Sequence, residues 1–286
     1  MAYGFDFPVI DAHVHTDFEA GEFKRIAKLG GIESEFSQKG LLAKCEREDL
    51  YAVNMGWKEF QGKTAPATPM GWKDNYYDNK RVFYVAGVNP AKSTGVHLKN
   101  AKKALKDGDA LGFKVYLGYF HEFPSSKKYE PYYELAEDYN VPIVFHTGDT
   151  WSETNYAKLK YSRPVGVDEV AVDYPNVAFV LAHFGQPWFW DAAEVVYKNK
   201  NVYADLSGAL ITGAGSEGLH DVVVAKLREA FALLGDYSKL MYGSDWPAAT
   251  MQFYSGFVKE AVPEKHHFKV FHENAKKVYH LEDSVK

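Results

Sequence analysis

Two histidines near the start of the chain, His13 and His15, are spaced for metal binding. They follow the apolar pair Val9 and Ile10 and lie two positions apart. In a β-strand, side chains two positions apart point to the same face. Two neutral imidazoles directed at one point can bind a divalent metal ion. Because an isolated His-x-His pair is more often two solvent-exposed histidines, the prediction depends on the rest of the chain.

Three more ligand-type side chains follow apolar runs further along the chain. Each run has the length and composition of a buried β-strand and is followed by a polar side chain. These side chains are His146 after residues 141–145, His183 after residues 177–182, and Asp245 after residues 240–244. In a closed barrel of parallel strands the carboxyl ends converge on one mouth, so such distant residues can meet.

A metal site built from these side chains would support hydrolytic chemistry. Three imidazoles and one carboxylate suit Zn²⁺ best, although Fe²⁺, Mn²⁺ and Co²⁺ accept the same donors. The predicted ligands are His13, His15, His146 and Asp245. Such an ion lowers the pKa of its bound water to about 7. His183 would then act beside that water as a general base or would polarise the substrate, while Asp245 could also shuttle the proton.

The composition describes an ordinary globular chain and excludes some partners. The chain has 286 residues, of which 46% are hydrophobic and 25% charged. With a formal net charge of −5, it offers no basic surface for nucleic acid or anionic lipid, and no run is apolar enough to span a membrane. Cys45 is the only cysteine, which fits a reducing compartment. With no signal-peptide pattern at the start, we expect a cytoplasmic protein.

Strand-like and helix-like runs alternate along the whole chain, which is typical of parallel βα units. Eight such strands are predicted, and eight strands close a barrel of about 250 residues. The expected strands are residues 9–13, 50–55, 82–88, 111–117, 141–146, 177–183, 202–206 and 240–244. We therefore predict a (β/α)₈ barrel, with residues 1–286 forming a single domain.

Helical spacing of apolar residues predicts helices at 130–139, 188–198, 217–234 and 269–281. Two long, aromatic-rich connections, residues 56–81 and 147–167, follow strands on the side where barrel enzymes place their sites. We interpret them as pocket walls or lids. Surface loops or a contact between subunits of a homo-oligomer would explain them equally well.

Five short motifs in order resemble the amidohydrolase superfamily. They are Val-Ile-Asp-Ala-His-Val-His at 9–15, Phe-His-Thr-Gly at 145–148, Leu-Ala-His-Phe-Gly at 181–185, Tyr-Gly-Ser-Asp-Trp-Pro at 242–247 and Glu-Asn-Ala-Lys-Lys-Val-Tyr at 273–279. The closest branch is the amidohydrolase-related group that includes aminocarboxymuconate-semialdehyde decarboxylase. The resemblance runs from about residue 9 to residue 281, and the joint order of the motifs is more specific than any one of them.

The resemblance implies a distorted (β/α)₈ TIM barrel with a single divalent metal ion. It also implies that the metal ligands are His13, His15, His146 and Asp245, with His183 as the catalytic histidine next to the metal. The branch contains both hydrolases and non-oxidative decarboxylases, so the resemblance does not fix the reaction.

Lys114 lies in the middle of the expected fourth strand, on the same face as Tyr116. In binuclear amidohydrolases a carbamylated lysine on the fourth strand bridges two metals. In a branch with one metal, a lysine at this place would contact an anionic group of the substrate, and a structural ion pair is the third interpretation. A metal content of about one ion per chain would exclude the bridge.

Several other polar residues are expected at the mouth of the barrel. We predict substrate contacts for Lys114, Tyr116, Asp149, Trp151 and Arg163. We expect Asp11 to bond to the backbone or orient a ligand rather than to bind metal. For Asp205, Ser207 and Gly208, which follow the seventh strand, a role in the site and ordinary turn chemistry are both plausible.

These residues predict a metal-dependent hydrolase that acts on an ester, lactone or amide of a small anionic molecule. The basic residues Lys114, Lys158, Lys160 and Arg163 favour an anionic substrate. The alternative is a metal-dependent non-oxidative decarboxylase of an aromatic or unsaturated acid. A third reading, a metal that serves only the structure, leaves His183 without a role.

Overall fold

Eight parallel strands form one sheet whose spatial order follows the sequence, from β1 to β8. The computed structural model describes residues 2–18, 21–56, 81–92, 95–150, 156–210 and 218–285. The strands are β1 (Val9–Val14), β2 (Leu50–Met55), β3 (Val82–Val88), β4 (Phe113–Val115), β5 (Ile143–His146), β6 (Phe179–Ala182), β7 (Val202–Asp205) and β8 (Leu240–Met241). Each strand pairs in parallel with the next strand in the sequence. The predicted (β/α)₈ barrel is confirmed.

The segment that follows β8 returns to β1 and joins the two edges of the sheet. The amide of Asp245 donates to the carbonyl oxygen of His13 at 2.9 Å, and the amide of His15 donates to that of Trp246 at 2.7 Å. These bonds hold two predicted metal ligands, His15 and Asp245, on neighbouring stretches of backbone. Closure of the barrel and assembly of the site therefore depend on the same contacts.

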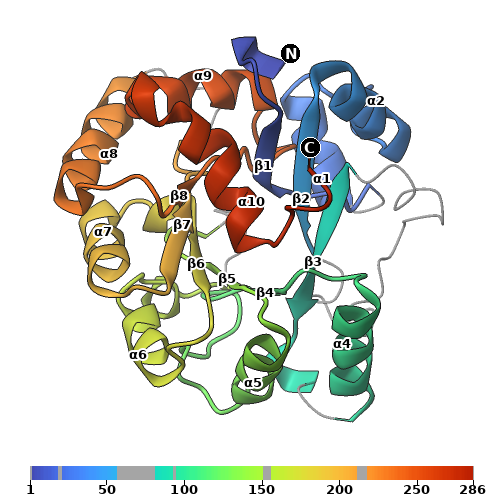
Figure 1. Ribbon diagram of the computed structural model, residues 1–286, viewed down its shortest axis with the longest axis vertical. Helices are drawn as coiled ribbons and strands as arrows, with labels where there is room; N and C mark the ends of the chain where they lie inside the picture. The colour runs from blue at the N-terminus through green and yellow to red at the C-terminus, as the bar shows by residue number, and fades with distance from the viewer. Residues whose placement is uncertain are drawn as a thin grey trace.

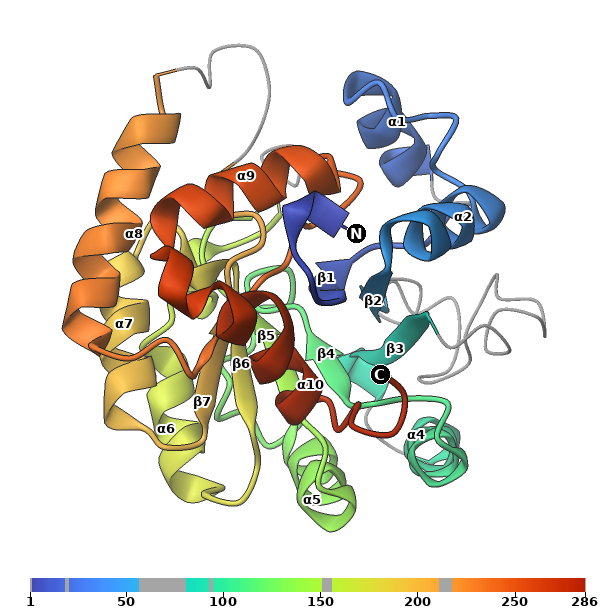
Figure 2. The same cartoon turned by 45° about the horizontal axis from the view of Figure 1, so that its top comes forward.

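Helices surround the barrel, and the last one lies across one end of it (Figures 1 and 2). The helices are α1 (Gly21–Leu29), α2 (Gln38–Glu48), α4 (Val96–Asp107), α5 (Glu130–Tyr139), α6 (Gly166–Asp173), α7 (Phe189–Lys198), α8 (His220–Leu234), α9 (Met251–Ala261) and α10 (Asn274–Val278). A π-helical segment, Lys269–Glu273, leads into α10. None of the helices in the described ranges is long and apolar enough to cross a membrane.

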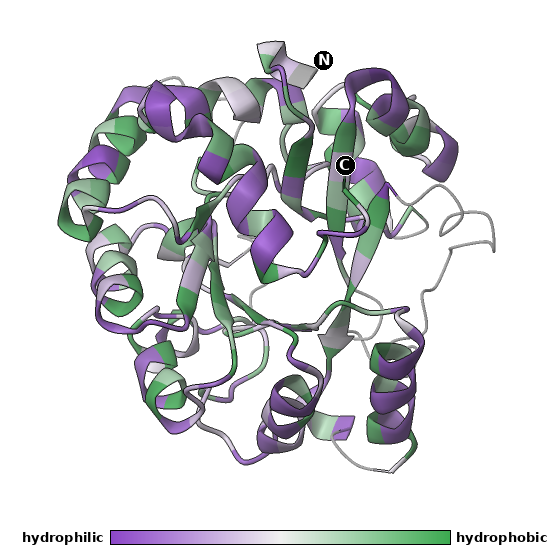
Figure 3. Cartoon of the chain, viewed as in Figure 1, coloured by the Kyte–Doolittle hydropathy of each residue, from purple (hydrophilic) through white to green (hydrophobic). Residues whose placement is uncertain are grey.

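Two buried layers follow from the alternation of side chains along the strands. Outward-facing residues such as Phe113 and Val115 pack under the helices, and Figure 3 shows the helices polar on their outer sides and the strands mostly apolar. Inward-facing residues fill the barrel lumen, together with Ala275 and Val278 of α10. The last helix therefore plugs the lumen that lies beneath the predicted ligands.

Some predicted boundaries were wrong, although all eight strands exist. Strands β4 and β8 are much shorter than expected. Beyond β8, the amide of Tyr242 donates to the carbonyl oxygen of Val270 at 2.8 Å rather than to a neighbouring strand. Helix α5 has the predicted bounds, whereas the last predicted helix is divided between the π-helical segment and α10. Of the two predicted lid segments, residues 57–80 and 151–155 lie outside the described residues.

Candidate metal centre and active site

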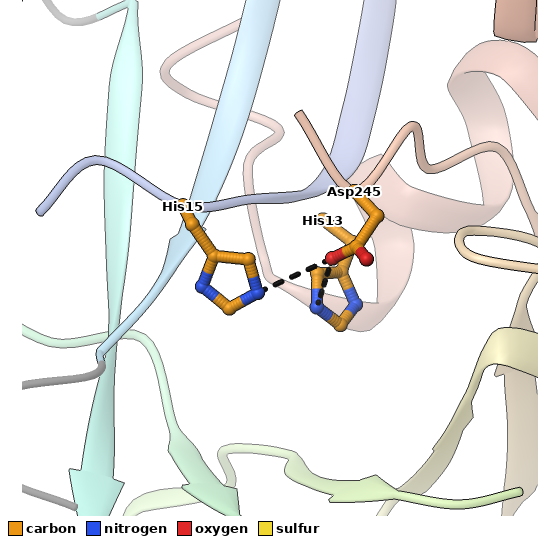
Figure 4. Close-up of side chains that lie close together, drawn as sticks. All are labelled: His13, His15 and Asp245. Carbon is orange, nitrogen blue, oxygen red and sulfur yellow. Dashed lines mark ion pairs between the residues drawn. The ribbon is translucent and has the colours of Figure 1, made fainter. Parts of the chain in front are cut away.

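Three of the predicted ligands converge at the mouth of the barrel (Figure 4). His13, His15 and Asp245 each offer one donor atom, and these atoms all lie within 4.8 Å of one another. Oδ1 of Asp245 is 3.2 Å from Nε2 of His15 and 3.5 Å from Nε2 of His13. These spacings bring two imidazole nitrogens and one carboxylate oxygen around a common point, as a divalent cation requires.

Local backbone geometry turns these ligands toward the mouth. The register between β1 and β2 shifts between Asp11 and Val14, which bends the strand where His13 lies. Asp245 has a φ of +59°, in the left-handed region that an aspartate tolerates better than most residues. Strain of this kind is concentrated at functional sites.

Asp11 fastens the two ligand-bearing segments to each other. Its fully buried carboxylate accepts hydrogen bonds from the amides of His13 at 3.2 Å and Ser244 at 2.9 Å. Burial nevertheless raises the pKa of Asp11 to about 7. The prediction that Asp11 bonds to the backbone is confirmed.

Asp205, at the end of β7, contacts the predicted metal ligand His13 on the side away from the candidate centre. Its Oδ2 lies 2.9 Å from Nδ1 of His13, and both side chains are fully buried. Its Oδ1 accepts hydrogen bonds from the amides of His183 and Ser207, each at 3.1 Å, and from the hydroxyl of Ser207. With Nδ1–H donated to this carboxylate, the lone pair of His13 is at Nε2, which faces the centre.

His183 starts the short turn after β6, and its ring lies beside that of His13. Its Nδ1 is 3.1 Å from the carbonyl oxygen and 3.0 Å from the hydroxyl of Ser207. Its ring centroid is 4.9 Å from that of His13. A backbone φ of +63° at His183 aims the ring inward, and Gly208 leaves room for it, because a Cβ there would lie 2.6 Å from Nδ1.

His146, the fourth predicted ligand, contacts His183 and not the group of His13, His15 and Asp245. Its Nδ1 is 3.0 Å from Nε2 of His183, and its Nε2 is 2.9 Å from the carbonyl oxygen of Asp149. It is therefore placed beside His183 rather than within the group formed by His13, His15 and Asp245. Its role as a metal ligand stays a prediction.

The histidines of the centre are held in the neutral form that binds metal. Burial, together with the nearby charge of Lys114, lowers the pKa of His13 to about 3, although Asp205 opposes the shift. Burial also lowers the pKa of His146 and of His183. For Asp245, burial alone would raise the pKa, but the close contact with His15 and the nearby imidazoles hold it well below its usual range.

The buried donor atoms fit a divalent cation. Nε2 of His13 and Oδ1 of Asp245 are both buried, and neither has a hydrogen-bond partner among the described residues. Buried polar atoms are rarely left without a partner unless an ion, water or ligand supplies one. Neutral imidazole and ionised carboxylate are also the forms that coordinate a metal.

Lys114 and Tyr116, two predicted substrate contacts, lie inside the barrel. Both side chains are almost completely buried, and Nζ of Lys114 is 5.4 Å from the centre of the Tyr116 ring. The Tyr116 hydroxyl donates to the carbonyl oxygen of Gly56 at 2.7 Å. The Tyr116 ring also faces that of His146, with centroids 6.4 Å apart.

The other predicted substrate contacts are more peripheral. Asp149 is exposed, although its carbonyl oxygen contacts His146. The guanidinium of Arg163 forms an exposed ion pair with Asp191. Trp151 lies outside the described residues. Substrate contact by these residues stays a prediction.

Sequence reasoning placed Asp205 at the mouth without identifying its partner. The pairing with His13 joins residues 192 positions apart in the chain. The only sequence feature that pointed to Asp205 was its position after a strand, and an acidic residue there is also typical of a turn.

Comparison with known proteins identifies the family and agrees with this fold. A family model described as Amidohydrolase matches residues 10–281, so the chain belongs to the amidohydrolase family. It is a metal-dependent enzyme of the amidohydrolase superfamily. No curated protein sequence matches the chain.

Solved structures of low sequence identity share the whole barrel. A 5-carboxyvanillate decarboxylase from Sphingomonas paucimobilis has a TM-score of 0.65 and 12% identity, and the match covers 96% of this chain and 99% of that one. A probable 2-pyrone-4,6-dicarboxylic acid hydrolase from Acinetobacter baumannii, with citric acid bound, has a TM-score of 0.63 and 16% identity, covering 95% and 99%. An amidohydrolase from Burkholderia multivorans with bound zinc has a TM-score of 0.63 and 15% identity, covering 96% and 99%.

Proposed function

We propose that this enzyme hydrolyses an ester, lactone or amide of a small anionic molecule, with a water molecule activated by one divalent metal ion. The observation that carries the proposal is the convergence of His13, His15 and Asp245 with His183 beside them at one mouth of the barrel. A purely structural metal site gives no reason for a further histidine aimed at the same centre.

His13, His15 and Asp245 would hold the ion, with His146 as the proposed fourth ligand. Zn²⁺ suits this donor set best, and zinc is bound in the amidohydrolase of Burkholderia multivorans. When bound, the ion would lower the pKa of a water molecule and polarise a carbonyl group.

The chain's own residues would manage the protons. Asp245 keeps its carboxylate ionised, so it can accept the proton of the attacking water and return it to the leaving group. Hydrogen bonding to Ser207 fixes the ring of His183, whose Nε2 lies on the side of the site. His183 would orient the water or stabilise the developing negative charge on the substrate.

The first experiment is metal analysis of the purified protein, followed by assays of Asp245→Asn. We expect about one divalent ion per chain. We also expect Asp245→Asn to lose at least 100-fold in turnover of any ester or lactone that the wild type hydrolyses, because a carboxamide cannot accept the proton. Asp107→Asn, an exposed change beside Lys103, is the control and should retain full activity.

A panel of hydroxybenzoates and lactones separates the two reactions. Proton release from lactones without CO₂ release from the acids supports the hydrolase. Release of CO₂ without hydrolysis would overturn the proposal in favour of the decarboxylase. Retained hydrolysis in Asp245→Asn would remove the mechanism.

A further inference from the structure

Lys114 occupies the floor of the candidate active site. It lies at the centre of β4, where the register pairs it with Val144, two residues before His146 on β5. Its neighbours Phe113 and Val115 pack outward under the helices, so Lys114 points into the lumen. The side chain therefore starts about one pleat below the level of His146.

The ammonium group of Lys114 has no partner of its own. It is completely buried, and its Nζ makes no hydrogen bond to any described residue. The carboxylate of Asp205 is committed to His13, and that of Asp245 contacts His15. Nζ lies over the face of the Tyr116 ring, 5.4 Å from its centroid, and this ring is a weak substitute for an anion.

An unpaired buried charge of this kind destabilises the folded protein unless a bound group supplies the opposite charge. Lys44, the other buried lysine of the described ranges, shows the ordinary arrangement, because its Nζ is 3.1 Å from a carboxylate oxygen of Glu48. Burial lowers the pKa of Lys114 to about 8, against the opposing effect of the Asp205 and Asp245 charges, so most of it is still charged at neutral pH.

We propose that Lys114 binds a carboxylate group of the substrate, which enters the barrel with this group innermost. A carboxylate fits better than a phosphate, because a phosphate dianion calls for several donors, and no arginine of the described residues is buried. This inference rests on the proposed function for the identity of the site and adds the class of substrate. Lys114 would then make the site bind acids more tightly than their neutral analogues.

Thermal unfolding of the zinc-loaded protein tests the subsite. Lys114→Met removes the charge and keeps the length of the side chain, and Lys44→Met is the control with an ion-paired lysine. Without ligand, we expect Lys114→Met to raise Tm by a few degrees and Lys44→Met to lower it or leave it unchanged. A fall in Tm for Lys114→Met larger than that for Lys44→Met would make Lys114 a structural ion pair and overturn the proposal.

Ligand probes complete the test. Millimolar benzoate, 2-furoate or malonate, compared with chloride at equal ionic strength, should raise Tm of the wild type and of Lys44→Met but not of Lys114→Met. Benzamide, the neutral analogue of benzoate, should have no effect on any of the three. The proposal is overturned if no carboxylate stabilises the wild type, if Lys114→Met responds equally, or if inorganic phosphate alone acts.

Metal content separates this inference from the proposed function. Lys114→Met should bind as much zinc as the wild type. If neither binds zinc but carboxylates still act through Lys114, the subsite stands and the hydrolase proposal fails. If bicarbonate raises the metal content of the wild type to about two ions per chain, and not that of Lys114→Met, Lys114 is a carbamylated bridge and the subsite proposal fails.

Discussion

Nδ1 of His13 lies 2.9 Å from Oδ2 of Asp205, and neither side chain is accessible to solvent. The imidazole thus has a carboxylate on one side and the candidate metal centre on the other. Such a carboxylate fixes the tautomer and the orientation of a metal-binding histidine and increases its basicity. We therefore expect the strength of metal binding to depend on Asp205, a residue that does not itself face the candidate centre.

The Asp205–His13 contact predicts that Asp205→Asn weakens metal binding by about 10- to 100-fold. A carboxamide can accept the same hydrogen bond but carries no charge to increase the basicity of the imidazole. Competition with a chromogenic chelator measures the affinity. Asp191→Asn, which breaks only an exposed ion pair, should bind metal as the wild type does. Equal affinities for the two variants would contradict this role of Asp205.

Gly208 predicts a steric effect on His183. In Gly208→Ala the new Cβ would lie 2.6 Å from Nδ1 of His183, at a φ of +55°. Gly235→Ala has a similar φ, +63°, with nothing close to the new Cβ, so it isolates the backbone strain. We expect Gly208→Ala to be less stable than Gly235→Ala by about 1–3 kcal/mol in urea unfolding. Only Gly208→Ala should also lose activity, and identical behaviour of the two variants would be inconsistent with this packing.

His146 provides a test of the fourth ligand. If its ring turns to the metal, His146→Ala should weaken metal binding as strongly as His15→Ala, by at least about 10-fold. If it serves only to position His183, His146→Ala should keep the metal and lose turnover. Metal affinity and activity, measured on both variants, distinguish these outcomes. We predict the first, and normal metal affinity in His146→Ala would refute it.

The buried histidines predict that the metal-free protein is destabilised by acid. As the pH falls through about 6.5, His13, His146 and His183 become protonated in the unfolded chain before they do so in the folded one. Asp11 opposes this trend, because its folded pKa of about 7 lies above that of the unfolded chain. Three histidines have lowered pKa values and one aspartate has a raised value. As the pH falls, the unfolded state therefore takes up more protons than the folded state.

The free energy of unfolding should therefore decrease with falling pH below about 6.5, by about 1.4 kcal/mol per pH unit for each net proton. Urea unfolding of chelator-treated protein at a series of pH values measures the slope. His13→Gln should have a shallower slope than the wild type. A wild-type stability that is flat or rises toward acid would show that these imidazoles are not held neutral.

The sequence alone was sufficient to predict the barrel and to place several polar residues at its mouth. Parallel strands that are buried on both faces must be apolar along their length, so eight of them are visible as eight apolar runs. A polar residue at the end of such a run then marks the mouth, as for His183 and Asp245. Strand ends were less predictable, because β4 and β8 end where neighbouring segments cease to pair with them.

Only the tertiary structure determined which of these residues meet. Whether Asp205 contacts His13, whether Lys114 finds a carboxylate, and which nitrogen of His146 faces His183 all depend on strand register and on neighbours far away in the chain. A local pattern fixes the face and the depth of a side chain. Its partners across the barrel depend on how the whole sheet closes, and that information is distributed over all eight strands.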